Sequence, residues 1–216
     1  MSTVLEERKT ETLADLVAGL GDVPLNRIRI RPALGTAVEQ DVLDIHDHED
    51  RLFELVDGVL VEKAMGYSES LIAALLIQLL RNHVERDNLG LVAAPDGMMR
   101  LRKGLVRMPD VSVVLWERLP ERKAPREPIP SLVPDLAVEV LSKSNTAAEI
   151  DRKLREYFAG GCQCAWVIDP DTRSARVYDS PEVSVLLTGE QIVTAEAVLP
   201  GFQITVSEIF IRSGIA

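Results

Sequence analysis

The fold is decided by residues 135–169, DLAVEVLSKSNTAAEIDRKLREYFAGGCQCAWVID. The stretch opens with a nearly continuous apolar run, which is typical of a strand covered on both faces. Thr146 and Glu149 have the spacing of a helix N-cap, and the apolar stripe that follows them stops at Gly160. Residues 164–169 have the pattern of a second buried strand. The stretch therefore predicts a strand, a helix and a strand that share one core.

The chain on either side adds further elements. Residues 53–62 are two short apolar runs around Asp57-Gly58, a dipeptide that strongly indicates a β-hairpin. Apolar residues recur at helical spacing from Ser68 to Asp87. Shorter strands are expected at residues 89–95, 98–102, 108–116, 175–178, 183–187 and 202–206, with a last helical turn at 207–210. This mixture of strands and helices predicts a fold of the α/β (α+β) class.

The first 50 residues differ from the rest of the chain. They contain a short amphipathic piece, an alternating Arg-Ile run and the acidic run DIHDHED at 44–50, which we expect to be a solvated loop. His46 and His48 could bind a metal there, but consecutive polar residues usually only solvate a loop. We therefore divide the chain into an N-terminal appendage, residues 1–50, and a main domain, residues 51–216.

Composition restricts the protein class. No apolar run approaches the length of about 18 residues that a membrane span needs, and the first residues do not resemble a secretory signal, so we expect a cytoplasmic protein. Cys162 and Cys164 stand one residue apart, which suits reduced thiols in a strand better than a disulfide or a zinc site.

The charge balance does not favour nucleic-acid binding by the whole molecule, because the formal charge is −10 and the pI about 4.9. Residues 100–126 are an exception, since Lys and Arg outnumber Asp and Glu there. This stretch is either a solvated hairpin and loop or a surface that follows a phosphate backbone.

Two carboxylates interrupt strands that are otherwise apolar. Asp110 begins the run 111–115, and Glu139 lies in the middle of 135–141. An ionised carboxylate in apolar surroundings costs several kcal/mol unless it is paired, hydrogen-bonded or bound to a metal. Each residue alone would most simply pair with an arginine or a backbone amide. Two of them, followed by a capped cationic helix, also suit a site for a hard divalent cation.

Lys153 is the third candidate. It lies three residues after Ile150 and one before Leu154, at the border of the buried stripe of the helix, so it can reach back toward Glu139. An ammonium beside a metal site can orient a water and stabilise charge on a phosphate. These are the parts of a metal-assisted phosphodiesterase, although a lysine at a helix edge is also a common surface residue.

The same residues resemble a known family. The likeness extends over about residues 50–212 and is carried by these motifs in order: Glu54-Leu55-Val56-Asp57-Gly58, Pro109-Asp110, Glu139-Val140-Leu141-Ser142-Lys143-Ser144-Asn145, Arg152-Lys153-Leu154-Arg155-Glu156-Tyr157, Ala165-Trp166-Val167-Ile168-Asp169-Pro170 and Leu199-Pro200-Gly201-Phe202. In this order they resemble the Uma-two family of restriction-endonuclease-like proteins, which belongs to the PD-(D/E)xK nuclease superfamily.

The resemblance implies a restriction-endonuclease-like fold, a mixed β-sheet flanked by helices. It also implies Mg²⁺, with Mn²⁺ as a substitute, held by Asp110, Glu139 and the backbone carbonyl of Val140. The superfamily's third motif residue is a lysine, but Leu141 stands at that position. Lys153 matches a lysine on the following helix, and Lys143 in the intervening loop is the competing candidate.

An additional metal-binding carboxylate is also implied, for which Glu62 is favoured over Glu69 and Glu54. The implied activity is hydrolysis of DNA phosphodiester bonds by an endonuclease, and a homodimer would supply the two centres that double-strand scission needs. Two alternatives remain. One is a non-catalytic binding module on the same fold, in a regulatory or mobile-element complex, and the other is an enzyme acting on RNA or another phosphodiester. The remaining residues that could carry chemistry, His83, Trp116 and Trp166, are expected to be structural.

Overall fold

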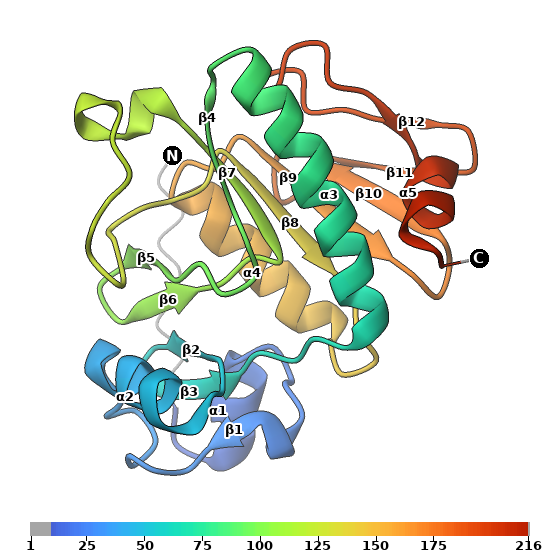
Figure 1. Ribbon diagram of the computed structural model, residues 1–216. Coiled ribbons are helices and arrows are strands. Elements are labelled where there is room, and N and C mark those ends of the chain that lie inside the picture. The colour runs from blue at the N-terminus through green and yellow to red at the C-terminus, as the bar shows by residue number, and fades with distance from the viewer. Residues whose placement is uncertain (1–9, 216) are drawn as a thin grey trace.

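Strands gather into two large sheets in residues 10–215, the part of the chain that the computed structural model describes (Figure 1). The five-stranded sheet has the spatial order β1 (Ile28–Arg29), β3 (Val59–Glu62), β2 (Phe53–Val56), β6 (Leu105–Arg107) and β5 (Met99–Arg102). The six-stranded sheet has the order β11 (Ser184–Thr188), β10 (Ser174–Tyr178), β9 (Cys164–Asp169), β8 (Leu136–Val140), β7 (Val111–Leu115) and β4 (Gly90–Ala93). A third pair consists of β12 (Ile192–Val193) and β13 (Ile204–Thr205).

Helices cover both faces of the six-stranded sheet. The side chains of α3 (Tyr67–Arg86) and α5 (Val206–Ser213) pack on one face, and those of α4 (Ala147–Ala159) pack on the other. The other helical elements are α1 (Leu13–Gly19), α2 (Glu39–Glu49), η1 (Leu25–Arg27), η2 (Trp116–Arg118) and η3 (Pro120–Arg122). The expected mixed sheet flanked by helices is confirmed. Within residues 10–215, no helix is both long enough and apolar enough to cross a bilayer.

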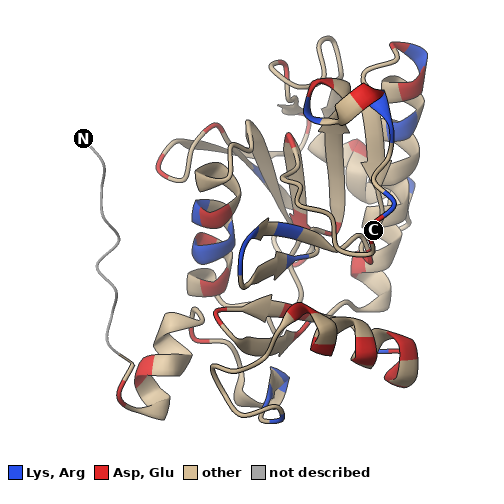
Figure 2. Ribbon diagram, turned by 90° about the vertical axis from the view of Figure 1, so that its left-hand side faces the viewer, with Lys and Arg blue, Asp and Glu red and all other residues tan. Residues whose placement is uncertain are grey.

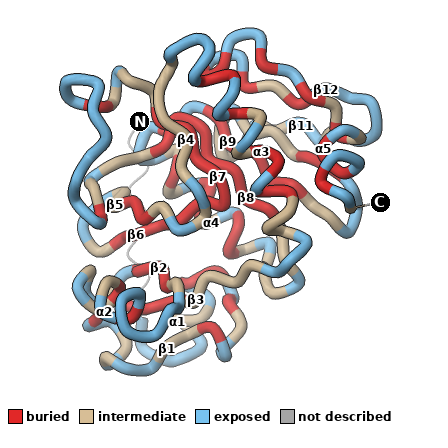
Figure 3. The backbone as a smooth tube through the Cα atoms, in the orientation of Figure 1, coloured by how far each residue is buried: buried red, intermediate tan, exposed pale blue. Residues whose placement is uncertain are grey.

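The central strand-helix-strand unit matches the prediction from residues 135–169. β8 and β9 lie parallel and α4 connects them, whereas the other strand pairs in the described sheets are antiparallel. β8 is buried along its whole length (Figure 3). Its even-numbered residues join the core beneath α3, while Ala137 joins the core beneath α4. Because side chains alternate along a strand, Glu139 is directed toward α4.

The predicted hairpin and long helix are also confirmed. β2 and β3 pair antiparallel around Asp57-Gly58, and both turn residues have positive φ, as the favoured two-residue hairpin turns require. α3 occupies almost the whole range 68–87 that the apolar periodicity indicates. Its buried side chains, among them Ile72, Leu76 and Leu80, form the core with β7, β8 and β9.

Two local predictions need correction. The strand expected at 108–116 is present as β7 but is shorter, Val111–Leu115, because residues 108–110, with Pro109 among them, link it to β6 of the other sheet. The acidic run 44–50, expected to be a loop, is mostly the C-terminal half of α2. Val42 and Ile45 explain this helix, because they lie three residues apart on one face and are buried against the five-stranded sheet. Figure 2 marks the acidic residues in red at several points along the ribbon of α2.

The segment before residue 50 packs into the fold in the described range. β1 pairs with β3, and α2 contributes to the core under β2. Arg27 is buried and binds both carboxylate oxygens of Glu149 on α4, at 2.9 and 2.8 Å. Thr146 caps α4 as predicted, since its Oγ1 accepts the Glu149 N–H at 3.0 Å, but the Glu149 side chain is turned toward Arg27. Arg27, β1 and α2 thus connect the segment before residue 50 to the rest of the fold.

Replacing Arg27 with methionine should therefore destabilise the whole protein. The change leaves the buried Glu149 without its cationic partner, and we expect a loss of about 3 kcal/mol in the free energy of unfolding. Urea denaturation monitored by tryptophan fluorescence would measure it. Arg29→Met is the matched control, because its partner Glu49 lies at the surface and the pair is exposed to solvent. Equal losses in the two variants would contradict the role assigned to Arg27.

Candidate active site

A cluster of buried charged side chains lies where α4 meets both large sheets. Glu139 is at its centre. One of its oxygens, Oε2, lies 3.0 Å from Nζ of Lys153, and the other, Oε1, accepts a hydrogen bond of 2.5 Å from the hydroxyl of Tyr157. Lys153 and Tyr157 are one helical turn apart on α4, so both reach the same carboxylate. The expected contact between Lys153 and Glu139 is therefore present.

The five-stranded sheet adds a second carboxylate to the cluster. Glu54 of β2 lies 3.3 Å from Nζ of Lys153, so this lysine contacts two acids at once. Glu54 also accepts the Met108 N–H at 3.0 Å and a hydrogen bond of 2.7 Å from Arg107. Arg107 extends the network to Glu156 of α4 at 2.6 Å. Glu54 is thereby held by the neighbouring strand β6, by the residue that follows β6, and by α4.

Asp110 lies at the start of β7, beside Glu139 on the neighbouring strand. Its Oδ2 accepts the backbone N–H of Val140 at 2.7 Å, and its Oδ1 is 2.8 Å from Nζ of Lys63. Lys63 follows β3 and also donates to the carbonyl of Met108. Asp110, Glu139 and Lys153 are only 4%, 5% and 3% exposed. The three side chains singled out from the sequence thus lie in one buried network.

Burial and charge shift the pKa values in this network. Burial raises the pKa of Glu139, as do the nearby Asp110 and Glu54 carboxylates, and Lys153 offsets the shift only in part. Burial would also raise the pKa of Glu54, but the charges of Lys153 and Arg107 hold it well below its usual range. The pKa of Lys153 is raised despite burial, because Glu139 and Glu54 flank it. Lys153 is therefore a persistent cation at neutral pH.

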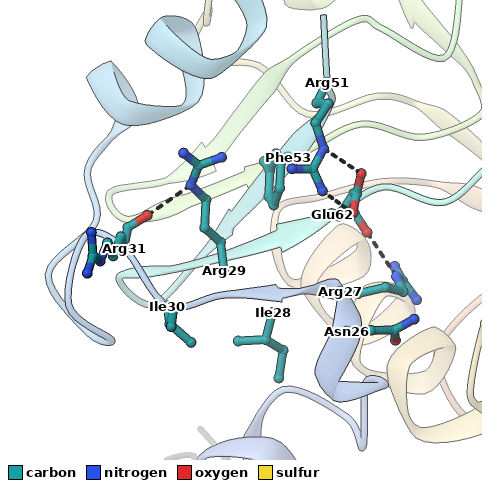
Figure 4. A pocket seen from close by; sticks show the side chains of 9 residues that line it. All are labelled: Asn26, Arg27, Ile28, Arg29, Ile30, Arg31, Arg51, Phe53 and Glu62. Carbon is teal, nitrogen blue, oxygen red and sulfur yellow. Dashed lines mark hydrogen bonds and ion pairs between the residues drawn. The ribbon is translucent and has the colours of Figure 1, made fainter. Parts of the chain in front are cut away.

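The other candidate residues lie outside the cluster. Glu62 is 29% exposed and pairs with Arg51 at 2.7 Å. It lines a surface cavity of about 460 Å³ together with Arg27 and Phe53 (Figure 4). Successive residues of a strand face opposite ways, which explains why Glu62 faces away while Lys63 faces the cluster. Glu54, and not the favoured Glu62, therefore lies in the cluster. Lys143 is exposed in the loop before α4, and Glu69 lies in the first turn of α3.

Sequence reasoning did not single out Lys63, Arg107, Glu156 or Tyr157 as site residues, and it ranked Glu54 below Glu62. Glu54 carries the same signal as Glu139, a charge inside a buried apolar strand, and could have been favoured on that ground. Tyr157 was assigned to the apolar stripe of α4, although its hydroxyl needs a partner when buried. Arg107 and Lys63 carry no comparable local signal, because their partners come from distant parts of the chain.

Two of the three residues expected to be structural, His83 and Trp166, are buried and pack against other side chains. His83 packs edge-on against Phe202 at 5.5 Å, and Trp166 is fully buried. Trp116 differs from the prediction, since it lies half-buried in η2 with Arg122 over its ring at 5.7 Å. Both cysteines are free and buried, and burial raises the pKa of Cys162 to about 11.

The basic stretch at 100–126 is largely neutralised by acids. Arg100 pairs with Glu39, Arg102 pairs with Asp57, and Arg107 pairs within the cluster. Figure 2 marks basic residues in blue along the ribbon of the β5–β6 hairpin, in which Lys103 is exposed. The hairpin is therefore a surface of mixed charge.

Comparison with known proteins identifies the family. A family model named Uma2 and described as "Putative restriction endonuclease" matches residues 39–207. The chain belongs to the Uma2 family. The match begins within α2 and ends within α5, so it includes every residue of the charged cluster. The resemblance to the Uma-two family noted from the motifs is confirmed.

A solved structure shares the Uma2 fold. It is described as a "putative nuclease belonging to DUF820" from Anabaena variabilis, and it matches with a TM-score of 0.67 and 19% sequence identity. The match covers 76% of this chain and 92% of that chain. No curated protein matches the sequence. The family match supports a nuclease, an enzyme of the hydrolase class.

The donor set of this Uma2 cluster suits a hard cation. Asp110, Glu139 and Glu54 offer only oxygen atoms, the ligands that Mg²⁺ and Mn²⁺ prefer. Among residues 10–215, no three His, Cys, Asp or Glu side chains converge closely enough to enclose an ion by themselves. Mg²⁺ does not require such a cage, because it usually takes one or two carboxylates and completes its shell with water and substrate phosphate. The residues present therefore fit Mg²⁺.

Proposed function

We propose that this protein is a Mg²⁺-dependent endonuclease that hydrolyses DNA phosphodiester bonds. The observation that carries the proposal is the contact of Lys153 with Glu139 in a buried site that also contains Asp110, each from a different element. Carboxylates that hold a cation beside a fixed ammonium are the groups that phosphodiester hydrolysis needs, because the phosphate becomes more negatively charged as water attacks. The Uma2 match supports the same reaction class.

Each side chain has a distinct task in this mechanism. Asp110 and Glu139 would hold the cation through oxygen atoms, with the Val140 carbonyl as a further donor. A bound Mg²⁺ would supply an activated water and polarise the scissile phosphate. Lys153 keeps its proton at neutral pH, because its pKa is raised, so it orients the water and stabilises negative charge on the phosphate but does not act as a base.

Residues around these groups fix their geometry. Tyr157 holds Glu139 Oε1, and burial together with the Glu139 charge raises the pKa of Tyr157 well above its usual value, so it remains a hydrogen-bond donor. Arg107 fixes Glu54, the second partner of Lys153. Such supporting contacts keep ligands in a productive orientation.

The proposal is tested by cleavage of supercoiled plasmid DNA. Cleavage is expected with Mg²⁺ or Mn²⁺ and none with EDTA. Glu62→Gln should retain wild-type activity, because Glu62 lies outside the cluster. Parallel assays with single-stranded DNA and RNA separate the substrate classes, and a duplex cut in both strands would favour a homodimer with two sites. Metal-independent cleavage, or no cleavage of any nucleic acid, would refute the proposal.

A second candidate function is a non-catalytic binding module on the same fold, in a regulatory or mobile-element complex. The closed state of the cluster favours it, since the charges of Asp110, Glu139 and Lys153 already have protein partners and are almost inaccessible to solvent. Calorimetry distinguishes the two functions. Uptake of Mn²⁺ that disappears in Asp110→Asn supports the enzyme, and DNA or protein binding without metal uptake supports the module.

Tyr157→Phe should shift the pH dependence of cleavage. The tyrosine hydroxyl favours the charged form of Glu139, so its removal raises the pKa of Glu139 further. Since the carboxylate form is needed to hold the cation, the acidic limb of the rate profile should move to higher pH. Mn²⁺ affinity should fall about 10-fold. Tyr178→Phe in β10 is the control, and an unchanged profile in Tyr157→Phe would contradict the assigned contact.

A further inference from the structure

Lys63 is the one cation in contact with Asp110 in the described part of the chain, and the mechanism above does not use it. Its side chain is 4% exposed, and its Nζ lies 2.8 Å from Asp110 Oδ1. The same ammonium donates to the carbonyl of Met108, two residues before Asp110. A side-chain ammonium thus sits between two oxygen donors of the kind that Mg²⁺ prefers.

The two partners of Asp110 differ in their freedom to move. The Val140 N–H that binds Oδ2 belongs to the backbone of β8, a strand buried in the middle of the sheet. Lys63 follows the end of β3, and its ammonium is carried on a flexible four-carbon side chain. If a cation is to bind Asp110, the Lys63 contact is the one that can yield without disturbing a strand.

The charges in the cluster also indicate that Lys63 would leave Asp110 when a cation binds. The cluster pairs four acids, Asp110, Glu139, Glu54 and Glu156, with three cations, Lys63, Lys153 and Arg107. Lys63 also acts on Glu139 and Glu54, because its charge counteracts the rise of the pKa of Glu139 and helps to lower that of Glu54. A divalent cation that entered while Lys63 stayed in place would meet a like charge at close range in a site shielded from water.

We propose that Lys63 is a built-in competitor of the divalent cation: its ammonium holds Asp110 in the metal-free protein and leaves it when the cation binds. The inference rests on the proposed metal site. Lys63 is accordingly a positioning residue that sets the metal concentration at which the site fills, and it keeps the Asp110 carboxylate paired until then.

Calorimetric titration with Mn²⁺ at fixed pH and ionic strength tests this competition. Lys63→Met has a side chain of similar length without the charge, and it should bind Mn²⁺ about 10-fold more tightly than the wild type. Lys103→Met, which removes an exposed charge from the β5–β6 hairpin, should leave the affinity unchanged and so controls for net charge. Equal or weaker binding by Lys63→Met would overturn the inference while leaving the metal site intact.

A second measurement uses the unaltered protein, so it holds even if Lys63→Met does not fold. Acetic anhydride labelling followed by mass spectrometry should find Lys63 protected without metal and several-fold more reactive at saturating Mn²⁺, with Lys103 equally reactive in both states. Unchanged protection of Lys63 at saturation would overturn the competition. If neither the wild type nor Lys63→Met takes up Mn²⁺, the inference and the proposed metal-dependent function are both refuted.

Discussion

Replacement of Lys153 with methionine is expected to lower the rate of Mg²⁺-dependent DNA cleavage by about 10²–10³-fold, the usual effect of removing one preorganised electrostatic group. Lys153 is the ammonium that contacts both Glu139 and Glu54, and methionine retains the length of the side chain without its charge. Since the interaction strengthens as charge develops on the phosphate, the loss should appear in kcat more than in KM. Single-turnover plasmid cleavage would measure it.

Lys143→Met is the matched control for this prediction. Lys143 is the alternative motif lysine in the sequence, but it is exposed in the loop before α4. Its replacement should leave the cleavage rate close to that of the wild type. The reverse pattern, an inactive Lys143→Met and an active Lys153→Met, would transfer the role to the loop lysine. Circular dichroism of both variants would verify that each protein is folded under the assay conditions.

Arg107→Met should produce the largest loss of stability. Arg107 is 2% exposed and pairs with Glu54 at 2.7 Å and with Glu156 at 2.6 Å. Its removal leaves these acids with fewer cationic partners in a buried site, and we expect the free energy of unfolding to fall by about 3–5 kcal/mol. Arg107→Lys keeps the charge but not the fork that spans both acids, so its effect should be intermediate. Urea denaturation at neutral pH would rank the variants.

The difference in the free energy of unfolding between the wild type and Arg107→Met should depend on pH, and this dependence tests whether charge causes the loss. The pKa of Glu54 is depressed below its ordinary value of 4.5 in the folded protein, in large part by Lys153 and Arg107. A depressed carboxyl pKa contributes stability above the unfolded value, and that contribution disappears as the pH falls through the folded value. The gap between the wild type and Arg107→Met should therefore narrow below about pH 4.5. A constant gap would show that packing, and not charge, accounts for the loss. Arg81→Met is the control, because Arg81 pairs with Glu85 on the exposed surface of a helix, and its replacement should change the free energy of unfolding little.

Local sequence patterns were sufficient to predict the part of the site that contains Glu139, Lys153 and Asp110. Glu139 and Lys153 belong to a single strand-helix-strand unit, and strand alternation together with the helical repeat determines that they face each other. Asp110 followed from the same argument about charge in an apolar strand. The hairpin and α3 were also predictable, because Asp57-Gly58 and the apolar periodicity are strong local signals.

The rest of the site could not be predicted in this way, because it is formed by contacts between distant segments of the chain. Glu54, Lys63 and Arg107 come from the five-stranded sheet, and no local pattern shows how that sheet meets α4. The helix at 39–49 was hidden because its polar face dominates the acidic run, although Val42 and Ile45 have helical spacing. The sequence could not show that Glu54 and not Glu62 lies in the cluster, since both belong to the hairpin and only tertiary packing determines which one is enclosed.

The short link from Met108 to Asp110 has a consequence for how the chain can vary in length. These residues carry the backbone from one sheet to the other, and they supply an amide to Glu54, a carbonyl to Lys63 and the carboxylate that binds Val140. One inserted residue would turn at least one of these groups away from its partner. The loop at 117–132 supplies no hydrogen-bonding group to the charged cluster. Insertions and deletions can therefore accumulate in this loop without altering the chemistry of the site.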